Sequence, residues 1–264
     1  MRLWSEMQYR SKLKQGRGQG VGVEYTPWIH VQDFSSCGTI SRVLGWKSKR
    51  VHHFVSNNEL RYFYQLEWLD SVLDIREQFP LLDVCATTNI ARQAGIKHPV
   101  NSQSGFPYVL TTDFLITTIN GVFARTVKHS TELRKQRVLE KLEIERRYWA
   151  VQGIDWQIIT EQEICWQMAY NVEWLHNSQT LKGLCIEETL LNKALHDVKA
   201  LYDGTDRSIF SICEELDSKY GVSSGLCLRL FKYLAANKLI KLDMDVKLNL
   251  SQPRPNMFAE VFAV

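Results

Sequence analysis

The part of the chain up to about residue 160 alternates between two spacings of apolar side chains. Over residues 56–71 the apolar positions recur every three or four residues, which predicts a helix. Residues 72–82 alternate as a strand does, and residues 108–128 form a β-branched, aromatic-rich run with a turn in its middle. A charged helix is expected at about 131–152 and a short buried strand at 155–160. This order of helices and strands is typical of an α/β domain.

Other stretches of the same region lack a clear period. Residues 11–24 are rich in glycine and basic side chains, so we expect a mobile arm or loop there. Residues 26–34 and 49–55 are short β-type runs broken by polar positions. Residues 83–107 show little periodicity and are expected to form a long connection.

The pattern changes after about residue 160. Residues 161–202 are expected to form helices with a break near 177–184, and residues 208–220 to form a capped amphipathic helix. A second helix is predicted at about 224–236, and residues 239–250 have the pattern of two short strands. Helix, turn, helix and β-wing in succession are typical of a winged-helix domain.

These patterns predict two domains, residues 1–165 and residues 166–264. A chain of 264 residues is long for one core and comfortable for two. The composition, 45% hydrophobic and 23% charged, is that of a soluble globular protein.

Nothing in the sequence suggests secretion or a membrane. The chain lacks a run of roughly 18 apolar residues, which a membrane span needs, and its first residues lack the apolar stretch of a secretion signal. The six cysteines lie far apart and form no CxxC pair, which disfavours a zinc site or a disulfide framework. We therefore expect a protein of a reducing cytoplasm with no membrane association.

The net charge of +3 is unevenly distributed. Residues 1–51 hold nine basic side chains against three acidic ones, a net charge of +6, so the remainder is slightly acidic. A basic arm on a near-neutral body suits a phosphate-rich partner, although a solvated basic terminus has the same composition. The candidates for DNA contact in and beside this region are Arg17, Lys47, Lys49, Arg50 and His52, with a structural imidazole as the alternative for His52.

Asp113 and Lys128 flank the dipeptide Asn120-Gly121, the strongest short signal for a hairpin turn. Asp113 stands seven residues before Asn120 and Lys128 seven residues after Gly121, so a two-residue hairpin would set them opposite each other on one face. A cross-strand ion pair on a wet sheet is the simplest explanation. However, Asp113 lies inside an apolar run, where an unpaired charge is costly.

Glu59 supplies a second carboxylate, at the start of the helix that precedes the sheet. It stands three residues after Ser56, so a capping box alone would explain it. Carboxylates from separate elements can instead converge on a hard cation, and a nearby lysine can offset charge on a phosphodiester. Asp74, Arg76 and Gln78 share a face of the next strand, where either plain ion pairing or proximity to such a site would explain them.

A helix-borne acid, a strand and a hairpin with an Asp and a Lys form the arrangement of PD-(D/E)xK, or restriction-endonuclease-like, nucleases. A series of motifs, in order along the chain, then resembles one family of them, the TnsA endonuclease subunits of Tn-seven-like transposases. These motifs are Arg17-Gly-Gln-Gly20, Tyr25-x-Pro-Trp28, Arg50-Val-His-His53, Leu66-Glu-Trp68, Val72-Leu-Asp-Ile-Arg-Glu-Gln-Phe-Pro-Leu81, Gly95-Ile-Lys-His-Pro99, Thr112-Asp-Phe-Leu115 and Glu145-Arg-Arg-Tyr-Trp149. The resemblance covers about residues 10–176, and the C-terminal third matches in type and position only.

The resemblance implies a restriction-endonuclease-like catalytic domain, a mixed sheet flanked by helices, followed by a mostly helical winged-helix domain. It implies a Mg²⁺-dependent enzyme, with Mn²⁺ as a substitute, that cuts the 5′ ends of a transposon in double-stranded DNA. The partners it implies are TnsB, a DDE transposase that cuts and joins the 3′ ends, and TnsC, an ATP-dependent regulator that contacts the C-terminal domain.

The family's metal ligands map onto Glu59 and Asp113, and its active-site lysine onto Lys128. Where the family has Gln two residues before that lysine, this chain has Thr126, whose shorter, uncharged hydroxyl ligates directly, through water or not at all. The Val127 carbonyl is a further candidate ligand, as backbone oxygens are for hard cations.

In the C-terminal domain, Arg229 and Lys232 lie on the second predicted helix and could meet DNA phosphates in a major groove. Winged helices also bind proteins, and Asp243 and Asp245 in the predicted wing fit the contact with TnsC better. Two other functions stay open: a non-catalytic assembly subunit that bridges TnsB and TnsC over a degenerate metal site, and a free-standing nuclease.

Overall fold

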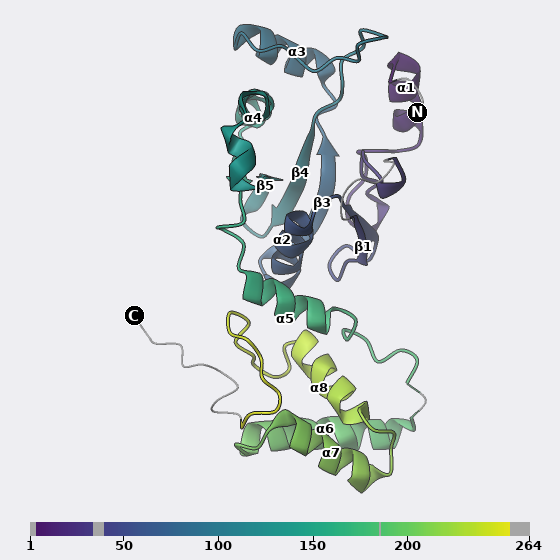
Figure 1. Ribbon diagram of the computed structural model, residues 1–264. Helices are drawn as coiled ribbons and strands as arrows, with labels where there is room; N and C mark the ends of the chain where they lie inside the picture. The colour runs from purple at the N-terminus through teal and green to yellow at the C-terminus, as the bar shows by residue number, and fades with distance from the viewer. Residues whose placement is uncertain (1–3, 34–39, 185, 254–264) are drawn as a thin grey trace. The chain divides into compact units, whose positions relative to one another are not determined.

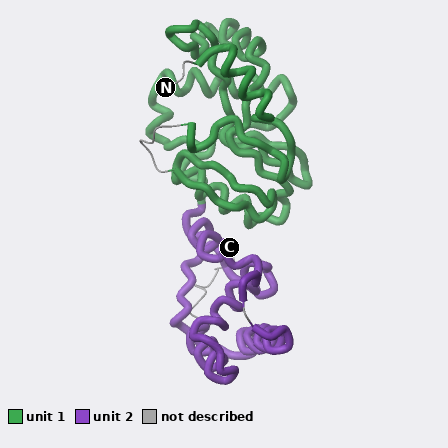
Figure 2. The backbone as a smooth tube through the Cα atoms, turned by 90° about the vertical axis from the view of Figure 1, so that its right-hand side faces the viewer, with its two compact units in different colours: residues 1–164 green, residues 165–264 purple. Residues whose placement is uncertain are grey.

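A computed structural model of the protein describes residues 4–33, 40–184 and 186–253. The chain divides into two compact units, residues 1–164 and 165–264, coloured separately in Figure 2. The division lies one residue before the limit expected from the sequence.

The first unit is built on a mixed four-stranded sheet with the strand order β3-β4-β5-β6. Figure 1 labels β3, β4 and β5 of this sheet. Its strands are β3 (Val72–Pro80), β4 (Thr111–Thr118), β5 (Gly121–Val127) and β6 (Asp155–Ile159). The first three pair antiparallel, and β6 pairs parallel to β5. A parallel neighbour needs a crossover connection, which helix α4 (Gln136–Val151) supplies after a short 3₁₀ turn, η3 (Ser130–Arg134). The α/β prediction is confirmed.

Both faces of the sheet are covered, because successive strand residues point to opposite sides. Leu115 and Ala124 form one buried cluster with Trp149 of α4. Phe114 faces the other way and packs against Phe54 and, through it, Phe63 of helix α2 (Asn57–Trp68), with ring centroids 6.1 Å and 4.7 Å apart.

The hairpin turn lies one residue earlier than the sequence suggested. Thr118 pairs with Gly121, so Ile119 and Asn120 form the turn. The Thr118 hydroxyl accepts a hydrogen bond from the Asn120 N–H and donates one to the Gly121 carbonyl, which closes the turn at Thr118. Continued along the strands, this register sets Asp113 across from Thr126, so the prediction that Lys128 stands directly opposite Asp113 is wrong.

Of the two forms expected for residues 11–24, a mobile arm or a loop, the structure has a packed loop that follows helix α1 (Glu6–Lys14). The Gly18 N–H donates to the Thr26 carbonyl. A Cβ atom on Gly18 would stand 2.2 Å from the Pro80 side chain, so only glycine allows the backbone this close to β3. Trp4 stacks on Tyr108 with ring centroids 5.9 Å apart and donates its indole N–H to the Pro107 carbonyl.

The two short β-type runs predicted at 49–55 and 26–34 meet different outcomes. Strand β2 (Val51–Phe54) pairs with β1 (Ser41–Leu44), which confirms the run at 49–55. The run at 26–34 holds the 3₁₀ turn η2 (Val31–Asp33) instead of a strand, and residue 34 lies outside the described residues. Another 3₁₀ turn, η1 (Gly22–Glu24), precedes this run.

Helix α3 (Val84–Gln93) occupies the expected long connection. The Asp83 carboxylate accepts from the Ala86 N–H at its start. Only Thr87 and Ala91 are buried, so the apolar period that would have predicted the helix is weak.

The second unit contains helices α5 (Trp166–His176), α6 (Glu188–Gly204), α7 (Ile209–Tyr220) and α8 (Leu226–Ala236), as predicted. The two strands predicted at 239–250 are wrong, since the structure has turns and irregular chain there. Donors from α5 and α6 hold this segment: the Asn171 amide donates to the Met244 and Val246 carbonyls, and the Tyr202 hydroxyl to the Lys241 carbonyl. These contacts use carbonyls that a wing strand would pair.

No helix in the described parts of the chain is both long enough and apolar enough to span a bilayer.

Candidate active site

Glu59 is fixed at the start of α2 by three hydrogen-bond donors. Its Oε1 accepts from the Ser56 hydroxyl at 2.9 Å, and its Oε2 accepts from the Val55 N–H and the Gln78 amide, both at 3.2 Å. The Ser56 hydroxyl in turn accepts the Glu59 N–H at 3.2 Å, which completes a capping box. The cap therefore exists, but the side chain is only 4% exposed, far more buried than a cap at a helix end requires.

Asp113 and Lys128 meet at the end of the hairpin, even though they are not directly paired. The Lys128 ammonium donates to Asp113 Oδ2 and to the Val127 carbonyl, both at 2.8 Å. The same Asp113 oxygen accepts the Val127 N–H at 2.8 Å. Asp113 is 7% exposed, so this is a buried contact and not the wet surface ion pair that is the simplest explanation of the spacing.

The charges of these three residues act on one another. Burial raises the pKa of Glu59 to about 7, and the neighbouring Asp113 charge adds to that rise. Burial opposes the charge on Lys128, but Asp113 outweighs it and the pKa of the ammonium is raised. The structure thus brings together Glu59, Asp113 and Lys128, with one more buried carboxylate than the lysine can neutralise.

A third carboxylate, which the sequence analysis did not single out, lies beside this group. Glu145 of α4 accepts hydrogen bonds from the Thr126 hydroxyl and from the Trp156 indole, the latter at 2.9 Å. Burial raises its pKa to about 7, with Asp113 contributing. Its spacing from Leu142 and Trp149 puts it on the apolar side of α4, a signal that could have found it.

Thr126 is the support of Glu145 in this arrangement. Its hydroxyl donates to Glu145 and accepts from the Trp156 indole at 3.3 Å, and the residue is 1% exposed. The prediction of Thr126 as a direct metal ligand therefore has no support in the geometry. The Val127 carbonyl remains a candidate ligand, with Lys128 as its present partner.

The donor set fits a hard divalent cation with few protein ligands. Mg²⁺ is commonly held by one or two carboxylates and keeps several waters. Glu59 and Asp113 are two such carboxylates, and a cation would offset the repulsion that raises the pKa of Glu59. Within the described residues no group of three or more His, Cys, Asp or Glu side chains is arranged as a metal cage.

Arg50 and His52 are not DNA-binding residues in this structure. The Arg50 guanidinium donates to Glu77 and to the Ile75 carbonyl, and the His52 ring lies between Glu77 and Ser48 at 2.7 Å and 2.6 Å. His52 is fully buried and Arg50 is 8% exposed, so neither side chain can reach a phosphate. The structural alternative for the imidazole is the correct one.

The remaining predicted DNA contacts differ in exposure. Arg17 donates to Asp33 and to the Trp28 carbonyl and has little free surface. Lys49 is exposed, with a left-handed backbone (φ 56°), and Lys47 is half-buried. For these two residues, DNA contact stays a prediction.

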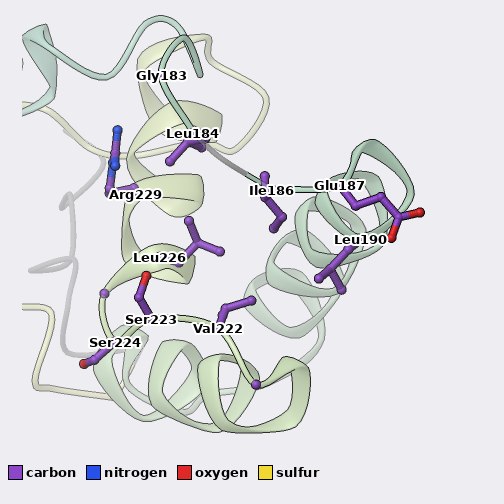
Figure 3. Close-up of a pocket in the computed structure, with 12 residues that line it drawn as sticks. Gly183, Leu184, Ile186, Glu187, Leu190, Val222, Ser223, Ser224, Leu226 and Arg229 are labelled. Atoms are coloured by element: carbon purple, nitrogen blue, oxygen red, sulfur yellow. The ribbon is translucent and has the colours of Figure 1, made fainter.

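In the second unit the two predicted DNA contacts on α8 also differ. The Lys232 ammonium lies over the Trp174 ring, 4.0 Å from the ring centroid, so part of its surface is already in contact with the protein. Arg229 is exposed at the edge of a cavity of about 600 Å³ between the α7–α8 turn and the start of α6 (Figure 3). Most of α8 is buried, which leaves few side chains to read a groove.

Two family models match the chain. The model described as TnsA-like endonuclease N terminal matches residues 69–161, which include Asp113 and Lys128 but not Glu59. The model described as TnsA endonuclease C terminal matches residues 163–244. The transposition protein TnsA of transposon Tn7 from Escherichia coli is 41% identical over 244 residues, 91% of this chain and 87% of that protein.

Proposed function

The chain belongs to the TnsA endonuclease family, and on this basis we propose that it cleaves DNA at the 5′ ends of a Tn7-like transposon. The observation that carries the proposal is the group formed by two buried carboxylates, Glu59 and Asp113, and the partly exposed Lys128 ammonium. Its two carboxylates and one ammonium come from three elements, with Lys128 and Asp113 in contact at 2.8 Å. Such groups are costly to bury and are a common feature of catalytic sites.

Glu59 and Asp113 would hold the divalent cation, which we propose to be Mg²⁺, with Mn²⁺ as a substitute. When bound, such a cation polarises a phosphodiester and lowers the pKa of its water. The Val127 carbonyl is a further candidate ligand, because the N–H of the same residue donates to Asp113.

Lys128 has a separate role in the proposed reaction. Its ammonium carries three N–H groups and donates two of them, to Asp113 and Val127, among the described residues. The remaining N–H can meet a phosphate oxygen and offset the negative charge that builds there as the bond to phosphorus breaks. The two fixed acceptors keep the ammonium in place before DNA binds.

We propose double-stranded transposon-end DNA as the substrate, within a bacterial cytoplasm, and TnsB and TnsC as protein partners, with the C-terminal unit as the contact for TnsC. The sparse polar surface of α8 supports a protein contact over DNA reading. The buried charges of the first unit favour catalysis over the non-catalytic assembly role, because a scaffold has no need of an under-neutralised carboxylate pair.

The test is strand-resolved cleavage of a labelled transposon end, with TnsB, TnsC and Mg²⁺ present. Asp113→Asn and Glu59→Ala should abolish 5′-strand cleavage and leave 3′-strand cleavage by TnsB in place. Asp155→Asn is the matched control, because Asp155 is a half-exposed carboxylate of the same sheet, paired with Arg125. If both active-site variants cut the 5′ strand as fast as wild type, the assignment of the site is wrong.

A further inference from the structure

Gln78 has an unusual backbone for its place in the protein. It lies within β3, is 2% exposed, and has φ of 49°, in the left-handed region. Residues other than glycine rarely adopt this region, and Asn does so more readily than most. In the pairing of β3 with β4, Glu77 pairs with Phe114 and Phe79 with Thr112. The pair that would lie between them, Gln78 and Asp113, is missing. The irregularity thus falls directly opposite a proposed metal ligand.

The surroundings hold this conformation in place. The Gln78 carbonyl accepts the Trp28 N–H at 3.2 Å, from the N-terminal segment on the other side of β3. The preceding residue, Glu77, is fixed by Arg50 and His52 in the buried network described above. Backbone strain of this kind persists where its surroundings enforce it, and it concentrates at functional sites.

The side chain connects the irregularity to Glu59. The Gln78 amide N–H₂ donates to Glu59 Oε2 at 3.2 Å, and its carbonyl oxygen accepts from the Thr111 hydroxyl at 3.5 Å. With the Val55 N–H, this gives Oε2 two donors, while Oε1 accepts one, from Ser56. The amide therefore binds Oε2, and Oε1 can still accept a further interaction.

We infer that Gln78 is a positioning residue, whose amide holds the Glu59 carboxylate in the orientation in which it would bind the cation. The inference rests on the proposed function. An amide suits this role because it is neutral at every pH of interest. A cationic side chain here would repel the metal, and a further carboxylate would add to the repulsion between Glu59 and Asp113. Gly or Asn would fit the backbone better but could not reach Glu59, so the amide at this length accounts for Gln78.

Two variants separate the amide from the backbone. Gln78→Asn and Gln78→Gly both suit a left-handed residue, and both withdraw the amide from Glu59, Asn being shorter by one carbon–carbon bond. Gln157→Asn is the matched control, the same change at an exposed position of β6. If Gln78 had a purely structural role, the substitutions would mainly lower the melting temperature.

We expect the melting temperature of both variants to stay near that of wild type. Mn²⁺ alone, titrated calorimetrically into the metal-free protein, should bind roughly 10- to 100-fold more weakly, as is usual when a support of a metal ligand is removed. In the complete reaction, the rate constant of 5′-strand cleavage at saturating DNA should fall by a similar factor, with the KM for DNA unchanged.

Mn²⁺ affinity and cleavage within twofold of wild type in Gln78→Asn would overturn the inference, as would losses that merely follow a lowered melting temperature. The proposed function fails separately, if wild type does not cut the 5′ strand or if Asp113→Asn still does. In that case the Mn²⁺ titration alone decides the role of Gln78.

Discussion

Two buried groups of charges lie in the first unit, and they differ in how completely they are neutralised. Glu77 accepts hydrogen bonds from Arg50, from the His52 ring and from the His53 N–H. Burial alone would raise the pKa of Glu77, but His52 and Arg50 lower it to about 2. Glu59 is also buried, and its pKa is about 7 because burial and the neighbouring Asp113 charge raise it more than its hydrogen-bond donors and Lys128 lower it.

The difference separates a structural network from the group that we propose to be catalytic. Around Glu77 every charge meets an opposite charge inside the protein, so the group needs nothing further. Around Glu59 and Asp113 one negative charge is left over, and a cation from solution can supply what the chain does not. The charges around Glu77 are neutralised by other residues of the protein, whereas those around Glu59 and Asp113 require a bound cation.

The largest expected effect comes from breaking the neutralised group. Glu77→Gln leaves Arg50 buried without its carboxylate, so the free energy of unfolding should fall by about 3–5 kcal/mol. Chemical denaturation measures it. Glu143→Gln is the control, because Glu143 forms ion pairs on the exposed side of α4 and its loss should cost less than about 1 kcal/mol. Equal losses in the two variants would contradict the comparison.

Next in size is the loss of the ammonium from the incompletely neutralised group. Lys128→Met should slow 5′-strand cleavage by roughly 10²- to 10³-fold, the usual effect of removing one group that stabilises transition-state charge. Single-turnover cleavage of labelled DNA measures the rate. Lys135→Met, at an exposed lysine paired with Glu132, should leave the rate unchanged. A wild-type rate in Lys128→Met would remove the lysine from the mechanism.

The pH dependence of stability should differ in sign between the two groups. Because folding raises the pKa of Glu59 from 4.5 to about 7, its contribution is greatest below pH 4.5 and is lost as the pH rises through 7. The loss is at most about 3 kcal/mol. Glu77 acts oppositely: its contribution is present above pH 4.5 and is lost as the pH falls toward 2.

Unfolding free energies of wild type and Glu59→Gln, measured from pH 5 to 8 without divalent metal, test this sign. The wild-type curve should fall relative to that of the variant as the pH rises, and Mg²⁺ should reduce the difference. Parallel curves would mean that folding does not raise the pKa of Glu59.

The smallest effect is expected at Thr126, which supports Glu145. Thr126→Val removes the hydroxyl that donates to Glu145, at a cost of about 1–3 kcal/mol in unfolding free energy. Mn²⁺ affinity should stay within about twofold, because the Thr126 hydroxyl is already bonded to Glu145 and to the Trp156 indole. A large loss of Mn²⁺ affinity would restore Thr126 as a ligand.

The sequence predicted the parts of the site that rest on local rules. The Ser56–Glu59 capping box and the hairpin around Asn120 are short-range signals, and they place Glu59 and Asp113 correctly on their elements. The motifs shared with the TnsA family predicted the family itself, as the comparison with the Tn7 protein shows.

The contacts that depend on the tertiary fold were not predictable in this way. The sequence predicts a DNA contact for Arg50 and offers a structural role for His52, but it does not identify Glu77 as their partner. Only the packing of β2 against β3 brings both residues to Glu77. The predicted wing failed because Asn171, some 70 residues earlier, takes its carbonyls. The sequence does not mark the left-handed backbone at position 78, because the residue there is Gln and not Gly or Asn.

The packing of the N-terminal segment has a consequence for biosynthesis. The carbonyl that accepts the Trp4 indole N–H belongs to Pro107, which is synthesised 103 residues after Trp4. At 5–20 residues per second, the segment waits roughly 5–20 s for its partner, with Trp4 and Tyr9 uncovered. The segment can therefore complete its docking only after Pro107 has been synthesised, and until then its aromatic rings are available to a chaperone that binds such side chains.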